Sequence, residues 1–491
     1  MIPTRQRATY RTQSWASVFA PALVILTGLL LRIGMLGVDA RFHPDEALFA
    51  AQARLISQHG DLLLRKTDLD KPPLTMYVTA LSFAALGPTE FAARLPNVLA
   101  SGASGAALYA LGRSLYRRRA VGLAAALLWS LSPFDLAFAA TAFTDVQATL
   151  WVLVAALLAA RGRWGWAGIA AALIAASKPT ALLFVPLIVA LGVAREASPG
   201  WRPGDVLRRL GRFVAPLAAG LALLVLWDSA RTPRSFWELG FERNNPGRFI
   251  RAGEVWPRLE RWLRWLDHAT GSRALNVALV AGAAVGAAGQ ALRGRDRRIL
   301  IDWLIGGFAV AFLGWHWLVA FNTYDRYLHP LIPFALLLAA RVLVMAWDHL
   351  GPRPVARAAM IAVAGVALLP GTAEALRGDA PIGGDRGQHT GIDALADAID
   401  AGLRGEIVYD HWLGWELAYY LGAEPAALVL YTPLPEALAA DTARQEHPRY
   451  FVAPSPAQAA PWIAALDRAG VRSQVEYHDP AHGFVIYRLE H

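Results

Sequence analysis

The sequence predicts a polytopic α-helical membrane protein with a smaller α/β domain at its C-terminal end. Only 17% of its 491 residues are charged, while 55% belong to the hydrophobic set; soluble domains carry about 25% charged residues. The apolar residues form blocks of membrane-spanning length that stop before about Gly383. These observations exclude an ordinary soluble enzyme. The lack of cysteine excludes disulfides, thiolate metal sites and cysteine nucleophiles.

About eleven apolar blocks are candidate spans, since a bilayer core takes about 20 residues per helix. They cover residues 18–36, 91–111, 121–136, 144–160, 164–176, 181–194, 213–226, 274–292, 299–320, 328–346 and 356–369. A basic stretch with Arg5, Arg7 and Arg11 precedes the first block, which we interpret as an uncleaved span with a cytoplasmic N-terminus. If each block crosses once, the arginine-rich short loops all fall inside.

This topology divides the chain into two predicted domains. Residues 1–372 form the membrane domain, with outer loops at 38–90 and 228–272. In residues 383–491 short strand-like runs alternate with helical ones, which is typical of a small α/β domain, and the odd number of spans puts it outside the cytoplasm. Leu74–Leu86 is apolar but too short to span, so we expect an interfacial or re-entrant helix. Lys178-Pro179 between two short blocks predicts a broken helix pair lining a cavity.

Ionisable residues cluster in the predicted outer segments, and the first cluster is RFHPDEALFA, with His43, Asp45 and Glu46. Pro44 can open a helix, and acids in its first turn suit the helix dipole, so simple capping is one interpretation. We favour a functional one, because paired carboxylates beside a bilayer are costly unless they are used.

Three further clusters follow the same pattern. Lys71 lies in DLDKPPL, where the double proline fixes it near the head groups and lets it hold a phosphate; ordinary snorkelling is the alternative. Asp145 opens the fourth span, close in predicted depth to Asp135 at the end of the third, and either caps its helix or acts chemically. Arg326 in YDRYLHP suits an anionic head group or phosphate, again with snorkelling as the alternative.

The stretch from Trp227 to His268 interleaves tryptophan with arginine, a composition also found on nucleic-acid surfaces. It lies between two predicted spans, and the run PRLERWLRWL places Trp and Arg on opposite sides of a helix. Such helices lie in the membrane interface against anionic head groups, so we expect membrane contact and no nucleic acid.

Taken in order, these elements resemble the bacterial family 39 glycosyltransferases of the protein-mannosyltransferase and aminoarabinose-transferase kind, which have the GT-C fold. The resemblance covers roughly Val24 to Pro333. It is carried by HPDEALFA, KPPL, GPTEFAARLPN, GRSLYRRRAVGLAAALLWSLSP, FTDVQATL, SKPTALL and YDRYLHPLIP.

The resemblance implies transfer of a sugar, with inversion, from a polyprenyl-phosphate-linked donor to a lipid, glycan or protein acceptor on the outer face of the cytoplasmic membrane. It implies that Asp45 is the general base, supported by Glu46, and that Asp145 is the second-loop acid. The donor phosphate would be held by Lys71 and Arg326, with Lys178 of SKPT as a weaker candidate. A divalent metal stays open, with His43 and Glu46 as conceivable ligands.

Other function classes make different demands on the sequence. A transporter or flippase of lipid-linked glycans would place charges near the midplane and often repeat its halves, whereas here the ionisable groups collect at the outer boundary and the halves do not match. A membrane scaffold would not need the acids around Asp45. A polymer ligase using a diphosphate-linked donor would need the same geometry as the transferase.

The predicted outer domain begins with an aromatic cluster made of Asp410, His411, Trp412 and Trp415. The cluster either stacks on sugar or packs at an edge of that domain, and we favour packing.

Overall fold

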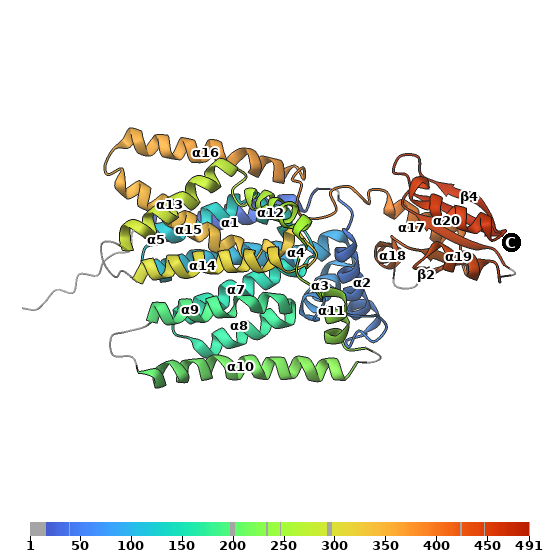
Figure 1. Ribbon diagram of the computed structural model, residues 1–491, viewed down its shortest axis with the longest axis horizontal. Helices are drawn as coiled ribbons and strands as arrows, with labels where there is room; N and C mark the ends of the chain where they lie inside the picture. Colours follow the sequence, from blue (N-terminus) through green and yellow to red (C-terminus); the bar gives the residue numbers. More distant parts are fainter. Residues whose placement is uncertain are drawn as a thin grey trace, which may run out of the picture.

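Long helices run side by side in the computed structural model, and an α/β unit lies beyond one end of them (Figure 1). The structure describes residues 16–490 except 39, 197–201, 232–233, 246, 292–296, 423–424 and 446. The basic stretch around Arg5, Arg7 and Arg11, which orients the first predicted span, lies outside the described residues.

A helix covers each of the eleven predicted blocks. The helices are α1 (Ala16–Met35), α4 (Glu90–Tyr116), α5 (Arg119–Leu131), α6 (Pro133–Ala139), α7 (Thr144–Ala160), α8 (Trp164–Ser177), α9 (Val185–Glu196), α10 (Pro203–Ser229), α13 (Arg273–Ala291), α14 (Arg297–Leu318), α15 (Ile332–His349) and α16 (Pro354–Leu376). The block predicted at residues 121–136 is divided between α5 and α6, which meet at a bend of 59°. Pro133 begins α6 at this bend, because proline has no N–H to continue the preceding helix.

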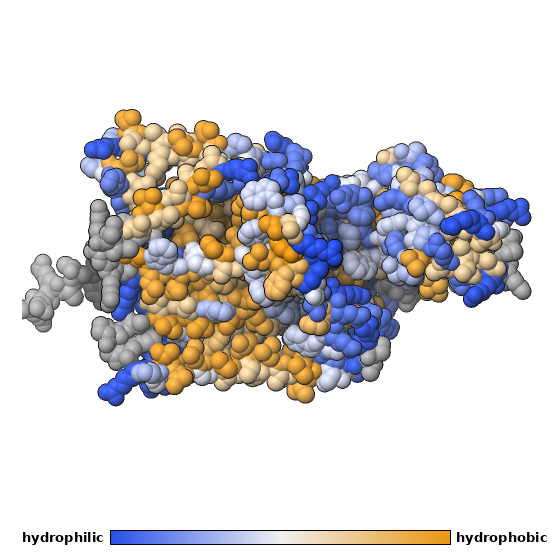
Figure 2. All heavy atoms as spheres, in the orientation of Figure 1, coloured by the Kyte–Doolittle hydropathy of each residue, from blue (hydrophilic) through white to orange (hydrophobic). Residues whose placement is uncertain are grey.

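The surface of this bundle marks it as a multi-pass membrane protein. Figure 2 shows a broad hydrophobic surface over the bundle and hydrophilic atoms toward its ends and over the α/β unit. Within the described ranges, five helices are long and apolar enough to cross a membrane, or six if the bent pair is one span. Several others, including α7 and α8, are apolar but shorter. The predicted membrane architecture is therefore confirmed, while the count of eleven crossings stays a prediction.

Short helices gather at the end of the bundle nearest the α/β unit, which we call the capped end. They are α2 (Pro44–His59), α3 (Leu74–Leu86), α11 (Phe236–Asn244), α12 (Ala252–Asp267) and the 3-10 turn η2 (Asp325–Leu328). Leu74–Leu86 is the segment predicted as an interfacial or re-entrant helix. In α12, Trp262 is buried against Trp265 and His316 while Trp256 is 72% exposed, so the helix is amphipathic as its sequence pattern predicts.

The chain breaks between α8 and α9, as Lys178-Pro179 predicts. Helix α8 ends at Ser177, Lys178 is extended with φ −156° and ψ 103°, and the 3-10 turn η1 (Pro179–Phe184) leads into α9. The residue before a proline is biased toward extended backbone, which explains why the break falls here. The break brings the side chain of Lys178 to the capped end of the bundle.

The C-terminal segment forms the predicted α/β unit around a five-stranded sheet of order β2-β1-β3-β5-β4. Strands β1 (Ile407–Asp410), β2 (Leu428–Tyr431) and β3 (Arg449–Ala453) are parallel, and β5 (Val485–Glu490) pairs antiparallel with β3 and with β4 (Arg472–His478). The helices are α17 (Ile392–Gly402), α18 (Gly414–Tyr420), α19 (Pro435–Thr442) and α20 (Pro456–Arg468). Two separate apolar clusters form the core of the unit.

Helix α18 docks this unit onto α2 and the start of α4. The hydroxyl of Tyr419 donates to the carbonyl of Pro88 at 2.8 Å, and that of Tyr420 donates to Glu90 at 2.5 Å. Arg54 of α2 lies over the Tyr419 ring, 4.3 Å from its centroid. Trp415 lies in the first turn of the same helix and lines a cavity together with residues of the bundle.

Candidate functional site

The first predicted cluster builds the N-terminus of α2. His43 Nδ1 accepts the N–H of Asp45 at 3.1 Å, and Glu46 Oε2 accepts the N–H of His43 at 3.1 Å, which together form a capping box. Burial lowers the pKa of His43, and a neutral ring keeps the lone pair that this cap requires. The other oxygen of Glu46 accepts from Arg94 Nε at 3.2 Å and from the N–H of Ala142 at 2.8 Å. His43 and Glu46 therefore hold the local structure.

Asp45 is the member of this cluster whose carboxylate turns to a different partner. Its Oδ2 lies 2.5 Å from Nη2 of Arg326. The guanidinium of Arg326 also lies over the rings of Tyr324 and Phe143, at 4.4 and 5.0 Å from their centroids. Asp325 holds the turn that presents Arg326, since its two oxygens accept the N–H groups of Arg326 and Gly383.

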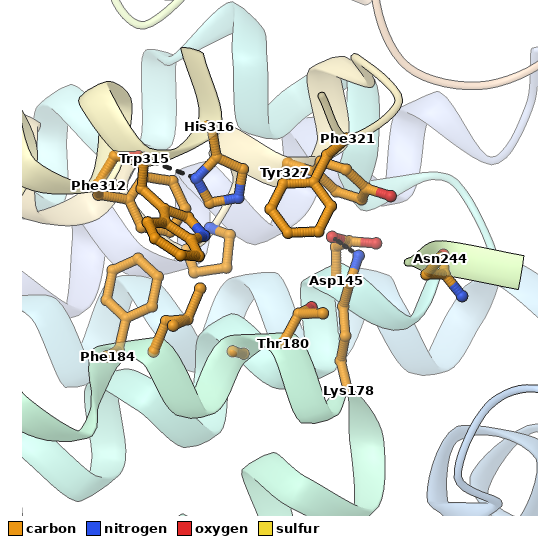
Figure 3. A pocket seen from close by; sticks show the side chains of 13 residues that line it. Asp145, Lys178, Thr180, Phe184, Asn244, Phe312, Trp315, His316, Phe321 and Tyr327 are labelled. Carbon is orange, nitrogen blue, oxygen red and sulfur yellow. Dashed lines mark hydrogen bonds and ion pairs between the residues drawn. The ribbon is translucent and has the colours of Figure 1, made fainter. Parts of the chain in front are cut away.

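Asp145 and Lys178 form a second ion pair beside the first. Both side chains are buried, and Lys178 Nζ lies 4.9 Å from the centroid of the Tyr327 ring. Figure 3 shows the two charged groups meeting near Tyr327, with Lys178 reaching up from the break before η1. The structure thus joins two residues that are 33 positions apart in sequence.

Lys71 enters from the loop before α3. Its Nζ lies 2.8 Å from Asp70 Oδ2, and the same oxygen lies 3.7 Å from Arg243 of α11. Helix α11 can approach this loop because residue 240 is glycine: a Cβ there would meet the carbonyl oxygen of Asp70 at 2.8 Å. The close approach adds a cation that the sequence pattern did not single out.

These groups line one cavity of about 830 Å³ at the capped end. Its charged lining residues are Asp45, Asp70, Asp145, Lys71, Lys178, Arg243 and Arg326, and its aromatic ones include Phe143, Trp237, Trp315, Tyr324, Tyr327 and Trp415. Cations therefore outnumber carboxylates on the described lining. An additional anion would be accommodated there without leaving an unpaired negative charge.

A narrower apolar slot of about 80 Å³ adjoins the Asp145–Lys178 pair. Its walls come from η1, α14 and the loop around Tyr327, and they include Phe184, Phe312 and Trp315. Figure 3 shows these aromatic side chains on one side of the ion pair, so the polar cavity continues into a hydrophobic passage.

The predicted site residues separate into two groups. Asp45, Asp145, Lys71, Lys178 and Arg326 meet at the cavity. His43 and Glu46 lie behind it and are occupied by capping contacts, and the described residues contain no group of three His, Asp or Glu side chains placed to hold a metal. The arrangement therefore does not fit the conceivable metal site at His43 and Glu46.

Asp135 and His329, the histidine of YDRYLHP, belong to a buried network. Asp135 accepts from Arg32 Nε at 2.8 Å and from Ser101 at 2.5 Å, and it contacts His329 Nε2 at 3.1 Å. All of these side chains are at most 1% exposed. Asp135 and His329 thus join α1, α4, α6 and the end of η2 inside the bundle, outside the cavity lining.

The aromatic cluster of the α/β unit divides in the same way. Asp410 is buried and accepts the N–H groups of Trp412 and Leu413, while Trp412 packs on Phe451 and Trp462. This is the packed edge that we favoured. Trp415 is 43% exposed and lines the cavity, so it is the member with access to a ligand.

The comparisons with known proteins support the expected resemblance. A family model described as dolichyl-phosphate-mannose-protein mannosyltransferase matches residues 70–201. An uncharacterized protein from Aquifex aeolicus is 27% identical over 140 residues, and the match spans only 28% of this chain and 28% of that relative.

Solved structures match over almost the whole chain. ArnT from Cupriavidus metallidurans bound to undecaprenyl phosphate is 17% identical, with a TM-score of 0.65 over 95% of this chain and 97% of that one. ArnT in the apo state gives 17% identity and a TM-score of 0.66 over 96% and 98%. The archaeal oligosaccharyltransferase AglB from Archaeoglobus fulgidus, in complex with an inhibitory peptide and a dolichol-phosphate, is 13% identical with a TM-score of 0.57 over 96% and 74%.

At such low identities, the structural matches establish the fold alone. The family model adds similarity of sequence within residues 70–201. The chain is therefore a multi-pass membrane protein with the GT-C fold of ArnT and AglB, similar to membrane glycosyltransferases.

Proposed function

We propose that the protein transfers a sugar from a polyprenyl-phosphate-linked donor to an acceptor at the capped end of the bundle. The observation that carries this proposal is that three cations and the carboxylates of Asp45 and Asp145 meet at one cavity that opens into an apolar slot; the cations are Lys71, Lys178 and Arg326. A charged head group on a long hydrocarbon chain matches both parts of that cavity.

The donor phosphate is the leaving group of the proposed reaction, and negative charge grows on it as the sugar departs. Cations fixed around the developing charge lower the barrier, and their effect is larger where water is scarce. Arg326 offers a planar fork of donors for the phosphate, and Lys71 and Lys178 act as point charges. The polyprenyl chain would then lie along Phe184, Phe312 and Trp315.

Asp45 is the proposed general base on the acceptor hydroxyl. Its carboxylate now pairs with Arg326 at 2.5 Å, and a donor phosphate would compete for the same guanidinium. Binding of the donor would thus weaken the pair and leave Asp45 able to take a proton from an acceptor within hydrogen-bond reach. Attack from the side opposite to the phosphate inverts the anomeric carbon. Glu46 acts at a distance here, because it fixes the turn that carries Asp45.

Asp145 has a related role in this proposal. It pairs with Lys178, and it lies within the same lining as Asp45. Trp415 and Trp237 offer aromatic faces on the cavity wall, which suit the apolar face of a sugar. The capped end would face outward from the cytoplasmic membrane, with the N-terminus in the cytoplasm, as the arginine-rich loops indicate.

Binding of undecaprenyl phosphate tests the donor site directly. The full-length protein in detergent should bind this lipid, and Lys71→Ala should weaken binding about 10-fold or more, since a hydrogen bond to a charged group contributes about 1.5–3 kcal/mol. Lys66→Ala removes an exposed lysine from the same loop and is the matched control. Equal binding by wild type and Lys71→Ala would contradict the assignment of Lys71.

Transfer itself is tested in cells. Mass spectrometry of envelope glycolipids and glycoproteins, with and without the gene, should show a sugar residue that is lost with the gene. That sugar and the molecule it leaves would identify donor and acceptor together. An unchanged envelope, in cells known to make the protein, would contradict the proposed function.

A further inference from the structure

A second polar cavity lies at the opposite end of the bundle, which we call the open end (at the left in Figure 1). Its volume is about 330 Å³, within the range of small-ligand pockets. It is lined by Leu115, Arg117, Ala194, Arg195, Arg297, Arg298 and Ile301, which come from the ends of α4, α9 and α14. All four ionisable residues among these lining residues are arginines.

The positions of two of these arginines conflict with the helix dipole. Arg117 at the C-cap of α4 and Arg195 in the last turn of α9 lie where a cation is stabilising. Arg297 and Arg298 instead lie in the first described turn of α14. A helix N-terminus carries partial positive charge, so cations there are destabilising and a bound anion is stabilising.

Arg195 shows how closely these arginines approach one another. Arg195 Nε donates to the carbonyl of Ser114 at 2.7 Å, which ties α9 to α4 at the pocket. Its charged surroundings include Arg117, Arg297 and Glu196, and Glu196 already pairs with Arg209 at 3.1 Å.

We propose that this pocket binds a phosphate group, carried either by the head group of an anionic lipid or by free phosphate. Several arginines and a helix N-terminus converge on one concavity, and a phosphate oxyanion would relieve their mutual repulsion. The sidedness of membrane proteins explains why arginines lie at this end, but it does not explain why they surround one pocket. The site lies at the far end of the bundle from the catalytic cavity and does not depend on the proposed reaction.

Lipid retention by the full-length protein is the first test. In native mass spectrometry, wild type should retain phosphatidylglycerol in preference to phosphatidylcholine. Arg195→Gln/Arg297→Gln should bind phosphatidylglycerol roughly 30-fold more weakly, given the contribution of each basic residue to anionic-lipid binding. Arg119→Gln/Arg353→Gln removes the same charge from exposed positions at the same end and should retain the preference. Equal loss in both double variants would overturn the proposal.

Arg297→Gln alone gives a test that does not depend on how the double variant folds. In nanodiscs of phosphatidylcholine it should unfold at a temperature equal to or above that of wild type, because it removes a cation from a helix N-terminus. Phosphatidylglycerol should raise the unfolding temperature of wild type more than that of Arg297→Gln. An equal gain in the two proteins would overturn the proposal.

Inorganic phosphate added to the phosphatidylcholine nanodiscs separates the two sources. Stabilisation of wild type but not of Arg297→Gln would identify a site that free phosphate can occupy. Stabilisation by phosphatidylglycerol alone would identify a lipid head group as the ligand. If neither addition distinguished wild type from the variant, the pocket would not be a phosphate site.

Discussion

Two groups of charged side chains in this protein differ in how many hydrogen-bond and ion-pair partners they have. In the Asp135 network, both carboxylate oxygens have partners, and Arg32 also donates to the carbonyls of Gly28 and Trp129 at 2.7 and 2.8 Å. At the cavity, Asp45 and Lys178 are each described with one charged partner. A saturated network has no capacity left for a ligand, whereas single pairs can exchange one partner for another. The difference separates structural charges from candidate catalytic ones.

Asp45→Asn should have the largest effect on activity. The amide keeps the shape of the side chain but cannot accept a proton from the acceptor, so transfer should fall by about 10²–10⁴-fold. The temperature of unfolding should stay near that of wild type, because Asp45 is partly exposed and outside the saturated network. Initial rates and thermal unfolding of the same preparation measure both quantities.

The control for this variant is Asp393→Asn, which removes a carboxylate that pairs with Arg41 at 2.9 Å on the α/β unit, outside the cavity lining. It should leave transfer unchanged. If Asp45→Asn kept wild-type rates, the assignment of Asp45 as the base would be wrong and Asp145 would be the next candidate.

Asp135→Ala should show the opposite pattern, with loss of stability as the main effect. It leaves the guanidinium of Arg32 buried without its counter-charge, which costs about 3–5 kcal/mol for a buried pair. Asp379→Ala breaks the exposed pair with Arg377 and should cost less than about 1 kcal/mol. Denaturation in detergent measures the loss of unfolding free energy in both variants. Similar losses would show that the Asp135 network stabilises the fold no more than an exposed ion pair does.

Arg326→Ala should weaken donor binding with little change in stability. The variant loses the fork of donors proposed for the phosphate, so the affinity for undecaprenyl phosphate should fall by about 10- to 100-fold. Arg326→Lys keeps the charge but not the fork and should lie between the two proteins. An unchanged affinity in the alanine variant would show that Arg326 serves only to hold Asp45.

The sequence was most informative where local structure depends on the spacing of a few neighbouring residues. HPDE places a cap acceptor and an acid three residues apart, so the capping box of His43 and Glu46 follows from one helical turn. Lys178-Pro179 predicts the break before η1 for the same local reason. The same spacing rules could not tell that Asp45 differs from Glu46, because the partner that distinguishes them, Arg326, is far away in the chain.

Residues recruited through tertiary packing were harder to predict. Arg243 belongs to a stretch rich in Trp and Arg that we expected at the membrane interface, and periodicity does not reveal which arginine faces Asp70. Asp135 and Asp145 are predicted at similar depth, yet the structure buries the first in a network and leaves the second on the cavity. A glycine at position 240 within that stretch was the one local signal of a close approach.

A third cluster of ionisable side chains lies in the α/β unit and its linker. It is intermediate between the Asp135 network and the ion pairs at the cavity. His389 faces Glu416 at 3.2 Å and also pairs with Asp385. Burial raises the pKa of Glu416 to about 7. Burial alone would lower the pKa of His389, but its hydrogen bond to Asp385 and the charge of Glu416 raise it overall.

Glu416→Gln should therefore change how stability depends on pH. A carboxyl whose folded pKa exceeds its unfolded value of 4.5 binds more protons in the folded state between pH 4.5 and about 7, so stability falls as pH rises through that window. The raised pKa of His389 acts in the same direction above pH 6.5.

Wild type should lose a few degrees of unfolding temperature between about pH 5 and 8. Glu416→Gln should lose less, and Glu476→Gln, at an exposed site of β4, should match wild type. If unfolding temperature changed with pH equally in all three proteins, Glu416 would be saturated by its surroundings, like Asp135. The cluster would then not be intermediate between the two groups.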